Sequence, residues 1–449
     1  MKRILAGLVS LILLGTLAPA VQANETELVV MSRNIYLGAD VGVAMELLPD
    51  FPAATQFMWD QMRQTDFAKR SKVLVAEVNV ELPDVIGIQE ATKWYCQSGL
   101  FSDQVVVFDF VEMLLNDLTT AGLNYQIATK DGQIAQNVGF EIAPIPQLTK
   151  AKDPDLFLSL FGKPEASCGF EIADVLLIKS SLASDVLAVG TTEYSEKYTI
   201  IPTLMSIYRG YSWADISING NPVRFVTTHL ESSFADNEIP VAKIQADQLV
   251  KDLAQTKIPI VLMGDFNSDP RDPRGSTSTN PGGQPSENDV CDPQVSNPNE
   301  QTALTQCNAF WTVIKGGYSS IGPDEQDPAN FTWGLNALLT GPDPARELVA
   351  KQMGNLAGFT DRLDYIFIKG PVQAKSAKLI GQVQSDLWGS DHAGVVATLS
   401  LTQPIEYQEV RLAQNERFPL GFWHGVLFVL IAGFSYFLVR RTRKLKRLN

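Results

Sequence analysis

Five short segments of the chain share one pattern, in which an apolar run rich in β-branched residues meets carboxylates, amides or imidazoles. Short apolar runs of this kind predict buried strands. The pattern therefore predicts several buried strands whose ends carry polar side chains of similar chemistry. The segments are residues 31–34, 86–90, 227–231 and 261–267, and the pair 361–366 and 389–392.

Histidine is rare in this chain, with three residues in 449. Two of them, His229 and His392, lie in the polar segments. A chain that uses histidine so sparingly has not scattered it over the surface, which makes both residues candidates for catalysis. The third, His424, lies in an apolar C-terminal stretch, and we assign it no chemistry.

Strand patterns alternate with helical patterns along the chain. Asn219-Gly220 indicates a tight hairpin turn. Mixed strands with interspersed helices and a hairpin favour an α/β fold, a four-layer α/β sandwich of two packed mixed sheets flanked by helices. Helices are predicted over residues 64–80, 105–118 and 239–253, and strands over 28–32, 83–89, 174–178, 212–218, 222–228, 259–263, 363–368 and 394–401.

Both ends of the chain carry targeting signals. Residues 1–23 have a basic start, an apolar stretch and small residues before a cleavage site, which predicts a secretory signal peptide. The alternative is an uncleaved N-terminal anchor. Residues 418–439 are apolar enough and long enough to cross a bilayer as a C-terminal transmembrane helix, and the basic tail 440–449 predicts a cytoplasmic end. We therefore expect a single-pass cell-membrane protein with its folded domain on the extracytoplasmic side.

The region between these ends is acidic. The whole chain has a net charge of −14, with 36 basic and 50 acidic residues. Without the eight basic residues at the two ends, the net charge falls to about −22. Such a surface does not attract polyanions through its overall field, but it suits a site that binds divalent cations.

The folded part is expected to be one catalytic domain over residues 25–402, followed by a stalk over 403–417. Two stretches read as insertions, at residues 130–167 and 269–306, because loops of this length in a compact domain are usually functional or disordered. The apolar run 156–161 in the first stretch is interpreted as a local helix face rather than a wedge that inserts into lipid.

The chain has four cysteines, Cys96, Cys168, Cys291 and Cys307. In an oxidising compartment an even count suggests two disulfides, with three possible pairings. Cys291–Cys307 would close a short loop and is the first choice, which leaves Cys96–Cys168.

Two chemical requirements select residues from the polar segments. Hard cations such as Mg²⁺ take oxygen ligands, which Asn34, Glu90 and Asp391 could supply. Hydrolysis at phosphorus needs proton transfer to or from the reacting oxygens. An imidazole beside a carboxylate meets that need, and Asp364 and His392 can form such a pair.

In this order the segments resemble the endonuclease/exonuclease/phosphatase superfamily, which includes deoxyribonuclease I, AP endonucleases, neutral sphingomyelinases and inositol polyphosphate phosphatases. Gly264-Asp265-Phe266-Asn267 and Ser390-Asp391-His392 are the most specific pieces. Residues 362–365 are similar to the AP endonuclease version of their motif. The resemblance covers most of the chain between residues 29 and 401, apart from the two insertions.

The resemblance implies a role for each residue. Asn34, Glu90 and Asp391 would bind Mg²⁺ or Mn²⁺. Asp265 and Asn267 would position the attacking water and the scissile phosphate. His229 would hydrogen-bond a phosphate oxygen or act as an acid, and Arg209 would bind phosphate. His392, oriented by Asp364, would be the general acid/base.

These roles predict an exported, membrane-tethered phosphodiesterase whose substrate is nucleic acid or phospholipid; no protein partner is predicted. The Asp364 motif and Arg209 favour a nuclease-like enzyme, which is the first choice. The acidic domain and the absence, between residues 125 and 174, of the tyrosine or second glutamate of some nucleases favour a sphingomyelinase-like enzyme or a phosphatase. A catalytically inactive, tethered binding protein is the third alternative.

Overall fold

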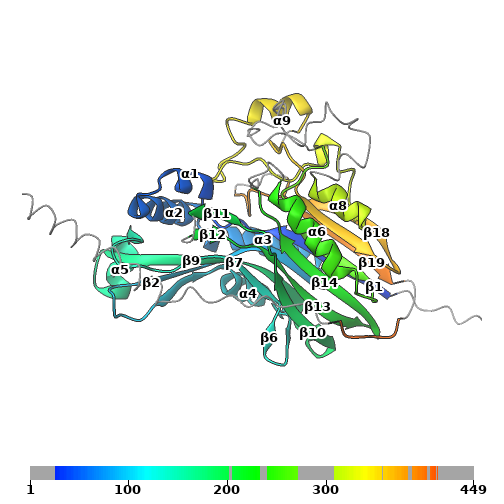
Figure 1. The fold of residues 1–449 in the computed structure, drawn as a ribbon. Coiled ribbons are helices and arrows are strands. Elements are labelled where there is room, and N and C mark those ends of the chain that lie inside the picture. The colour runs from blue at the N-terminus through cyan, green and yellow to red at the C-terminus, as the bar shows by residue number, and fades with distance from the viewer. Residues whose placement is uncertain are drawn as a thin grey trace, which may run out of the picture.

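The computed structural model describes residues 26–201, 205–232, 240–271, 308–355, 357–382, 387–401, 405–410 and 412. These residues form two mixed β-sheets that pack face to face, with helices on the two outer faces (Figure 1). The predicted α/β sandwich of two packed mixed sheets is thereby confirmed. The predicted signal peptide, the transmembrane helix 418–439 and the basic tail lie outside the described residues. No helix within the described part is long and apolar enough to span a membrane.

The first sheet has nine strands in the described part and runs in the order β18-β19-β1-β2-β9-β4, with β3 beside β2 and with β7 and β8 beside β9. Its central pair, β1 and β2, is parallel, whereas β1 is antiparallel to β19 and β2 is antiparallel to β9. The bounds are β1 Thr26–Asn34, β2 Val85–Gln97, β3 Val105–Asp109, β4 Tyr125–Ile127, β7 Gln136–Ile142, β8 Lys150–Lys152, β9 Glu165–Lys179, β18 Val372–Ile380 and β19 Gly394–Leu401.

The second sheet has six strands in the order β10-β13-β14-β15-β17-β16, and only β14 and β15 are parallel neighbours. Asn219 and Gly220 both adopt positive φ in the turn between β13 and β14, which confirms the predicted hairpin. The bounds are β10 Val186–Glu193, β13 Gly210–Ile218, β14 Asn221–His229, β15 Ile260–Asp265, β16 Ser319–Ile321 and β17 Asp364–Lys369. Two small ribbons lie outside both sheets: β5 Thr129–Lys130 with β6 Gln133–Ile134, and β11 Tyr198–Ile201 with β12 Met205–Ile207.

The central core lies between the two sheets, because alternate residues of each strand point to the same face. Val30 and Leu176 of the first sheet and Phe225 and Val261 of the second belong to one cluster of buried side chains. Helices α2, α3 and α4 bury apolar residues in a cluster on the outer face of the first sheet. Helices α6 and α8 do the same on the second sheet. The helix bounds are α1 Val41–Glu46, α2 Phe51–Thr65, α3 Phe67–Glu81, α4 Phe110–Thr120, α5 Pro154–Phe161, α6 Val241–Leu253, α8 Ala309–Lys315 and α9 Glu347–Met353.

The prediction of one helix over residues 105–118 is wrong in its first part. Residues 105–109 form strand β3, which pairs with β2, and the helix α4 begins only at Phe110. Asp109 caps that helix, since its carboxylate accepts a hydrogen bond from the Glu112 amide. The helical spacing continued through the β-branched run before the cap, so pattern alone could not locate the boundary.

Much of the predicted first insertion belongs to the first sheet. Strands β7 and β8 lie within residues 130–167 and both pair with β9. The apolar run in the same stretch forms helix α5, as expected. The second insertion falls almost entirely outside the described residues.

Cys96 and Cys168 form a disulfide between paired positions of β2 and β9, as expected. The other expected pair, Cys291 and Cys307, lies outside the described residues.

Arg70 of α3 is fully buried and ties the end of β1 to the segment that precedes β19. Its guanidinium donates hydrogen bonds to the backbone carbonyls of Thr65, Ile35, Tyr36 and Gly389. Burial of this charge is tolerable because the guanidinium finds acceptors on several sides. The side chain therefore holds together two segments that carry predicted site residues.

Replacing Arg70 by methionine should lower the free energy of unfolding by at least about 3 kcal/mol, because four buried carbonyl groups lose a charged donor. The measurement is urea denaturation followed by tryptophan fluorescence. Lys69→Met is the matched control: Lys69 precedes Arg70 on α3, and its side chain is 72% exposed. The control should change stability by less than about 0.5 kcal/mol. Equal losses in both variants would contradict the bridging role.

Candidate functional site

The site forms where strands of both sheets end. Asn34, His229 and Asp265 are the last residues of β1, β14 and β15, and Asp364 is the first residue of β17. His229 lies opposite Asp265 in the parallel pairing, and Asp265 lies opposite Asp364 in the antiparallel pairing. The register of this sheet thus brings together residues that are up to 135 positions apart in the chain, and Asn34 reaches them from the other sheet.

Glu90 enters the site from a bulge in β2. The pairing of β2 with β9 shifts between Ile88 and Ala91, and Glu90 has a φ of 60°. A positive φ is unusual for glutamate and costs on the order of 1 kcal/mol, so surrounding contacts must hold it. One carboxylate oxygen accepts from the Leu37 amide at 2.6 Å, and the other accepts from Asn34 Nδ2 at 3.0 Å.

Asn34 links the two sheets. Its Nδ2 also donates to Asp265 Oδ2 at 3.1 Å, while its Oδ1 accepts from the Tyr36 amide at 2.9 Å. The amide nitrogen, rather than the oxygen, therefore faces the two carboxylates in this structure. The role of Asn34 as a metal ligand stays a prediction.

His392 is held between carboxylates. Its Nδ1 lies 2.9 Å from Asp364 Oδ2, and its Nε2 lies 3.6 Å from Asp265 Oδ2. Arg33 donates to the His392 carbonyl oxygen, which fixes the backbone as well. The predicted pair of Asp364 and His392 is present, with the carboxylate fully buried.

The charges around His392 shift several pKa values. Burial opposes protonation of His392, but Asp364, Asp265 and Asp391 outweigh it and raise the pKa of this imidazole well above its ordinary value. Burial, opposed by His392, raises the pKa of Asp265 to about 7 and that of Asp391 to about 6. The site therefore holds its protons more tightly than separate side chains in water would.

His229 has the opposite environment. Burial, together with the positive charge of Arg209, lowers its pKa well below the ordinary value. Arg209 can only donate, so its contact with His229 Nδ1 at 3.0 Å leaves the proton of a neutral imidazole on Nε2. That nitrogen lies 3.5 Å from Asp265 Oδ2 and 3.0 Å from Asn267 Nδ2. His229 is thus built to stay neutral and to donate from Nε2.

Arg209 itself is engaged by the protein. Besides its contact with His229, it donates to Glu231 Oε2 at 3.2 Å, and only 14% of its side chain is exposed. Asp174, whose role the sequence left open, is buried nearby and its charge acts on Arg209. Arg209 therefore orients His229, and its predicted role in binding phosphate stays a prediction.

A cavity of about 420 Å³ opens over these residues. Glu90, Asp265, Asp391 and His392 line it on one side. The segment between α8 and β17 supplies the other wall, including Trp333 and Arg346. Sequence reasoning missed both, because a tryptophan and an arginine in a loop carry no spacing signal.

Trp333 and Arg346 contact the predicted site residues directly. Trp333 Nε1 donates to Asp391 Oδ2 at 3.3 Å, and Arg346 stacks on the Trp333 ring at 4.2 Å. Arg346 also binds Asp361 at 3.1 Å. Asp361, interpreted from sequence as a loop carboxylate, is therefore buried in an ion pair at the cavity wall.

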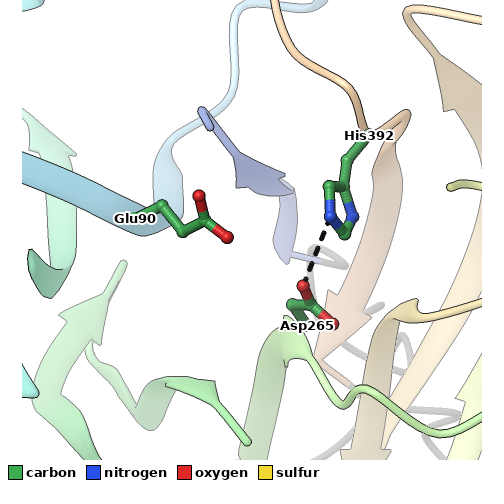
Figure 2. A group of neighbouring side chains, drawn as sticks. All are labelled: Glu90, Asp265 and His392. Atoms are coloured by element: carbon green, nitrogen blue, oxygen red, sulfur yellow. Dashed lines mark ion pairs between the residues drawn. The ribbon is translucent and has the colours of Figure 1, made fainter. Parts of the chain in front are cut away.

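Three side chains converge as candidate metal donors. Glu90, Asp265 and His392 each offer one ligand atom, and these atoms lie within 4.8 Å of one another (Figure 2). A protonated His392 would be a poor ligand. The carboxylates of Glu90 and Asp265 then remain as donors, and the Asp391 carboxylate lines the same cavity. Oxygen donors of this kind fit a hard divalent cation, so the residues present suit the predicted Mg²⁺ or Mn²⁺.

Comparison with protein families finds a match for part of this chain. Residues 196–392 match the model of the Endonuclease/Exonuclease/phosphatase family. The resemblance that the motifs predicted is therefore confirmed over this part of the chain. Members of this superfamily are phosphoester hydrolases. Comparison with curated proteins found no significant match.

Comparison with solved structures finds matches of low sequence identity. A family protein from Leptotrichia buccalis C-1013-b is 14% identical, with 82% of this chain and 98% of that chain covered and a TM-score of 0.45. One from Beutenbergia cavernae DSM 12333 is 16% identical, with 84% and 72% covered and a TM-score of 0.46. A mannosyl-6-phosphatase from Bacteroides thetaiotaomicron VPI-5482 is 16% identical, with 83% and 99% covered and a TM-score of 0.41.

The two site histidines should titrate on opposite sides of the ordinary histidine pKa of about 6.5. In metal-free protein His392 should keep its proton well above that pH, and His229 should lose its proton well below it. Asp364→Asn should lower the pKa of His392, because its principal negative neighbour is lost. Nitrogen-15 NMR of the imidazole rings measures both, and three histidines make assignment simple. A His392 that deprotonates below pH 6.5 in the unaltered protein would contradict this account.

Proposed function

We propose that the protein is a divalent-metal-dependent phosphodiesterase. The observation that carries the proposal is the buried cluster in which Asp364 holds His392 and in which Glu90, Asp265 and His392 converge. A bound Mg²⁺ or Mn²⁺ would polarise a phosphoryl oxygen and neutralise developing negative charge. Every predicted position is filled by a chemically competent residue, which disfavours an inactive binding protein.

The proposed roles combine the family resemblance with the contacts. Glu90 and Asp391 would hold the cation, and Asn34 would join them through its amide oxygen, which in this structure accepts from the Tyr36 amide. Hydrolysis joins a water oxygen to phosphorus and breaks the bond to the leaving oxygen, which takes up a proton.

His392 is placed to supply or accept that proton, since Asp364 fixes its Nδ1 and its Nε2 faces the cavity. Asp265 and Asn267 orient the water and the phosphate, and neutral His229 donates from Nε2 to a phosphoryl oxygen. Arg209 and Glu231 keep His229 in that state.

The substrate class has two candidates. The Asp364 motif favours nucleic acid, but the second argument for a nuclease, a free phosphate-binding arginine, is weakened by the contacts of Arg209. We also propose, from the sequence of the two ends, that the domain is exported and tethered to the cell membrane through its C-terminal helix. A phospholipid diester is then equally accessible to the site.

A substrate panel tests the reaction class. The purified full chain should hydrolyse bis-p-nitrophenyl phosphate with Mg²⁺ or Mn²⁺ and should lose that activity in a chelator. DNA, RNA and phospholipid vesicles complete the panel, each with an Asp364→Asn preparation as the background control. Absence of metal-dependent hydrolysis of every substrate would favour the inactive binding protein instead.

Two amide substitutions separate proton transfer from metal binding. Asp364→Asn should lower kcat by roughly 10²- to 10⁴-fold, because His392 loses its charged partner, while the Mg²⁺ concentration for half-maximal activity stays near that of the unaltered enzyme. Glu90→Gln should instead raise that concentration, since a charged ligand is lost. Metal titrations of both variants provide the measurement. If Asp364→Asn shifts the metal requirement as far as Glu90→Gln does, Asp364 is a ligand and its assigned role is wrong.

A further inference from the structure

Two further cavities adjoin the site cavity. A middle cavity of about 220 Å³ shares Leu37, Val41, Glu90, Arg209, His229 and Ser232 with the site cavity. An apolar cavity of about 60 Å³ shares Val41, Met45 and Phe140 with the middle one. The three cavities therefore form a series that begins at the catalytic residues and ends beneath α1.

The far end of the series is apolar on all sides. Apart from Thr55 and Thr149, its lining within the described residues has no side chain with a polar oxygen or nitrogen. Helices α1 and α2 form one wall, and strands β7 and β9 form the other. Six of the residues that line it are Ala44, Met45, Phe51, Met58, Phe140 and Phe170.

The size of this end discriminates between occupants. An apolar cavity that accommodates a benzene ring has a volume of about 150 Å³. The cavity beneath α1 is smaller, so an extended alkyl chain suits it better than a nucleobase or an aromatic ring. Apart from Thr55 and Thr149, its lining also offers the edges of a base no side-chain hydrogen-bond partner.

The negative charge of the site cavity also favours a lipid diester over a polynucleotide. Asp40 and Asp343 line it beyond the catalytic carboxylates. A polynucleotide would bring additional phosphates against these acids, whereas a lipid diester carries one phosphate, at the catalytic residues.

We propose that the substrate is an amphipathic phosphodiester, a lipid whose phosphate binds at the Glu90–His392 site and one of whose alkyl chains lies in the apolar cavity beneath α1. This inference rests on the proposed phosphodiesterase function and names its substrate class. The series of cavities selects this substrate, because a molecule that fills the series must be polar at one end and narrow and apolar at the other.

An exposed apolar surface lies near the same end of the molecule. Helix α5 lies close to α2 (Figure 1). Phe157 of α5 contacts Trp59 of α2, with ring centroids 4.9 Å apart, and Trp59 Nε1 donates to Asp153, the cap of α5. Other apolar residues of α5 face solvent, with Leu158 53% and Leu160 44% exposed. Exposed apolar side chains beside a lipid cavity fit an enzyme that takes its substrate from a bilayer surface.

The test compares two diesters that differ only in chain length, methyl p-nitrophenyl phosphate and octyl p-nitrophenyl phosphate. The full chain is assayed with Mg²⁺ in a detergent without alkyl chains, below the concentration at which the octyl ester forms micelles. The octyl ester should have a kcat/KM at least tenfold higher, since burial of only two methylene groups is worth roughly that factor.

Met45→Trp should bring the two kcat/KM values to within about twofold of each other, because the indole fills the junction of the middle and apolar cavities. Hydrolysis of the methyl ester should fall less than hydrolysis of the octyl ester, because a methyl group does not reach this junction. Val43→Trp is the matched control on α1, because Val43 is 40% exposed and lines none of these cavities. It should keep the preference for the octyl ester.

The outcomes separate the two proposals. Equal hydrolysis of both esters by the unaltered chain would overturn the alkyl-chain site and leave the phosphodiesterase standing. Cleavage of DNA or RNA in preference to the octyl ester, untouched by Met45→Trp, would make nucleic acid the substrate and overturn the inference. If neither ester is hydrolysed, the proposed function fails; calorimetry with octyl and methyl phosphate then tests the cavity alone, and equal affinities overturn it too.

Discussion

The pairing of β15 with a strand on each side is the constraint on which the site depends. β14 is parallel to β15 and β17 is antiparallel to it, so the carboxyl end of β15 meets the end of one neighbour and the start of the other. Asp265 thereby acquires His229 and Asp364 as neighbours in the sheet. Asn34 then joins this sheet to the other through its contacts with Asp265 and Glu90. A shift of one residue in either register would turn these side chains to the opposite face.

The same geometry gives two histidines opposite electrostatic roles a short distance apart. His392 faces Asp364, Asp265 and Asp391, which hold its proton in place against the effect of burial. His229 faces Arg209, which acts with burial to keep it neutral. The crowding of acids also raises the pKa values of Asp265 and Asp391. A divalent cation would relieve that crowding, so a preference for metal is built into the arrangement of the anions.

The segment that follows β1 connects the acid cluster to the apolar cavity beneath α1. Asn34 ends the strand at the acid cluster, and within a few residues the chain enters α1, whose Met45 lines the apolar cavity. Arg70 holds the start of this segment through the carbonyls of Ile35 and Tyr36. The acid cluster and the apolar cavity are therefore joined by the short segment between β1 and α1, which Arg70 of α3 holds at its start.

The sequence by itself determined the fold class, most strand positions and the set of polar residues that converge, because apolar runs with polar ends are local patterns. It also indicated the Asp364–His392 pair and the Cys96–Cys168 disulfide. The sequence did not predict where α4 begins, because the helical spacing of apolar residues extends to the N-terminal side of the Asp109 cap.

Tertiary structure alone decided what the polar residues contact. Arg209 resembled a phosphate-binding residue in sequence, and only the structure shows its contacts with Glu231 and His229. Trp333 and Arg346 reach the site across loops that no periodicity describes. The bulge that turns Glu90 inward and the cavity beneath α1 arise from contacts between segments far apart in the chain. The physical reason is that propensity and patterning act over a few residues, whereas register, burial and charge neighbours are set by whichever segments the folded chain brings together.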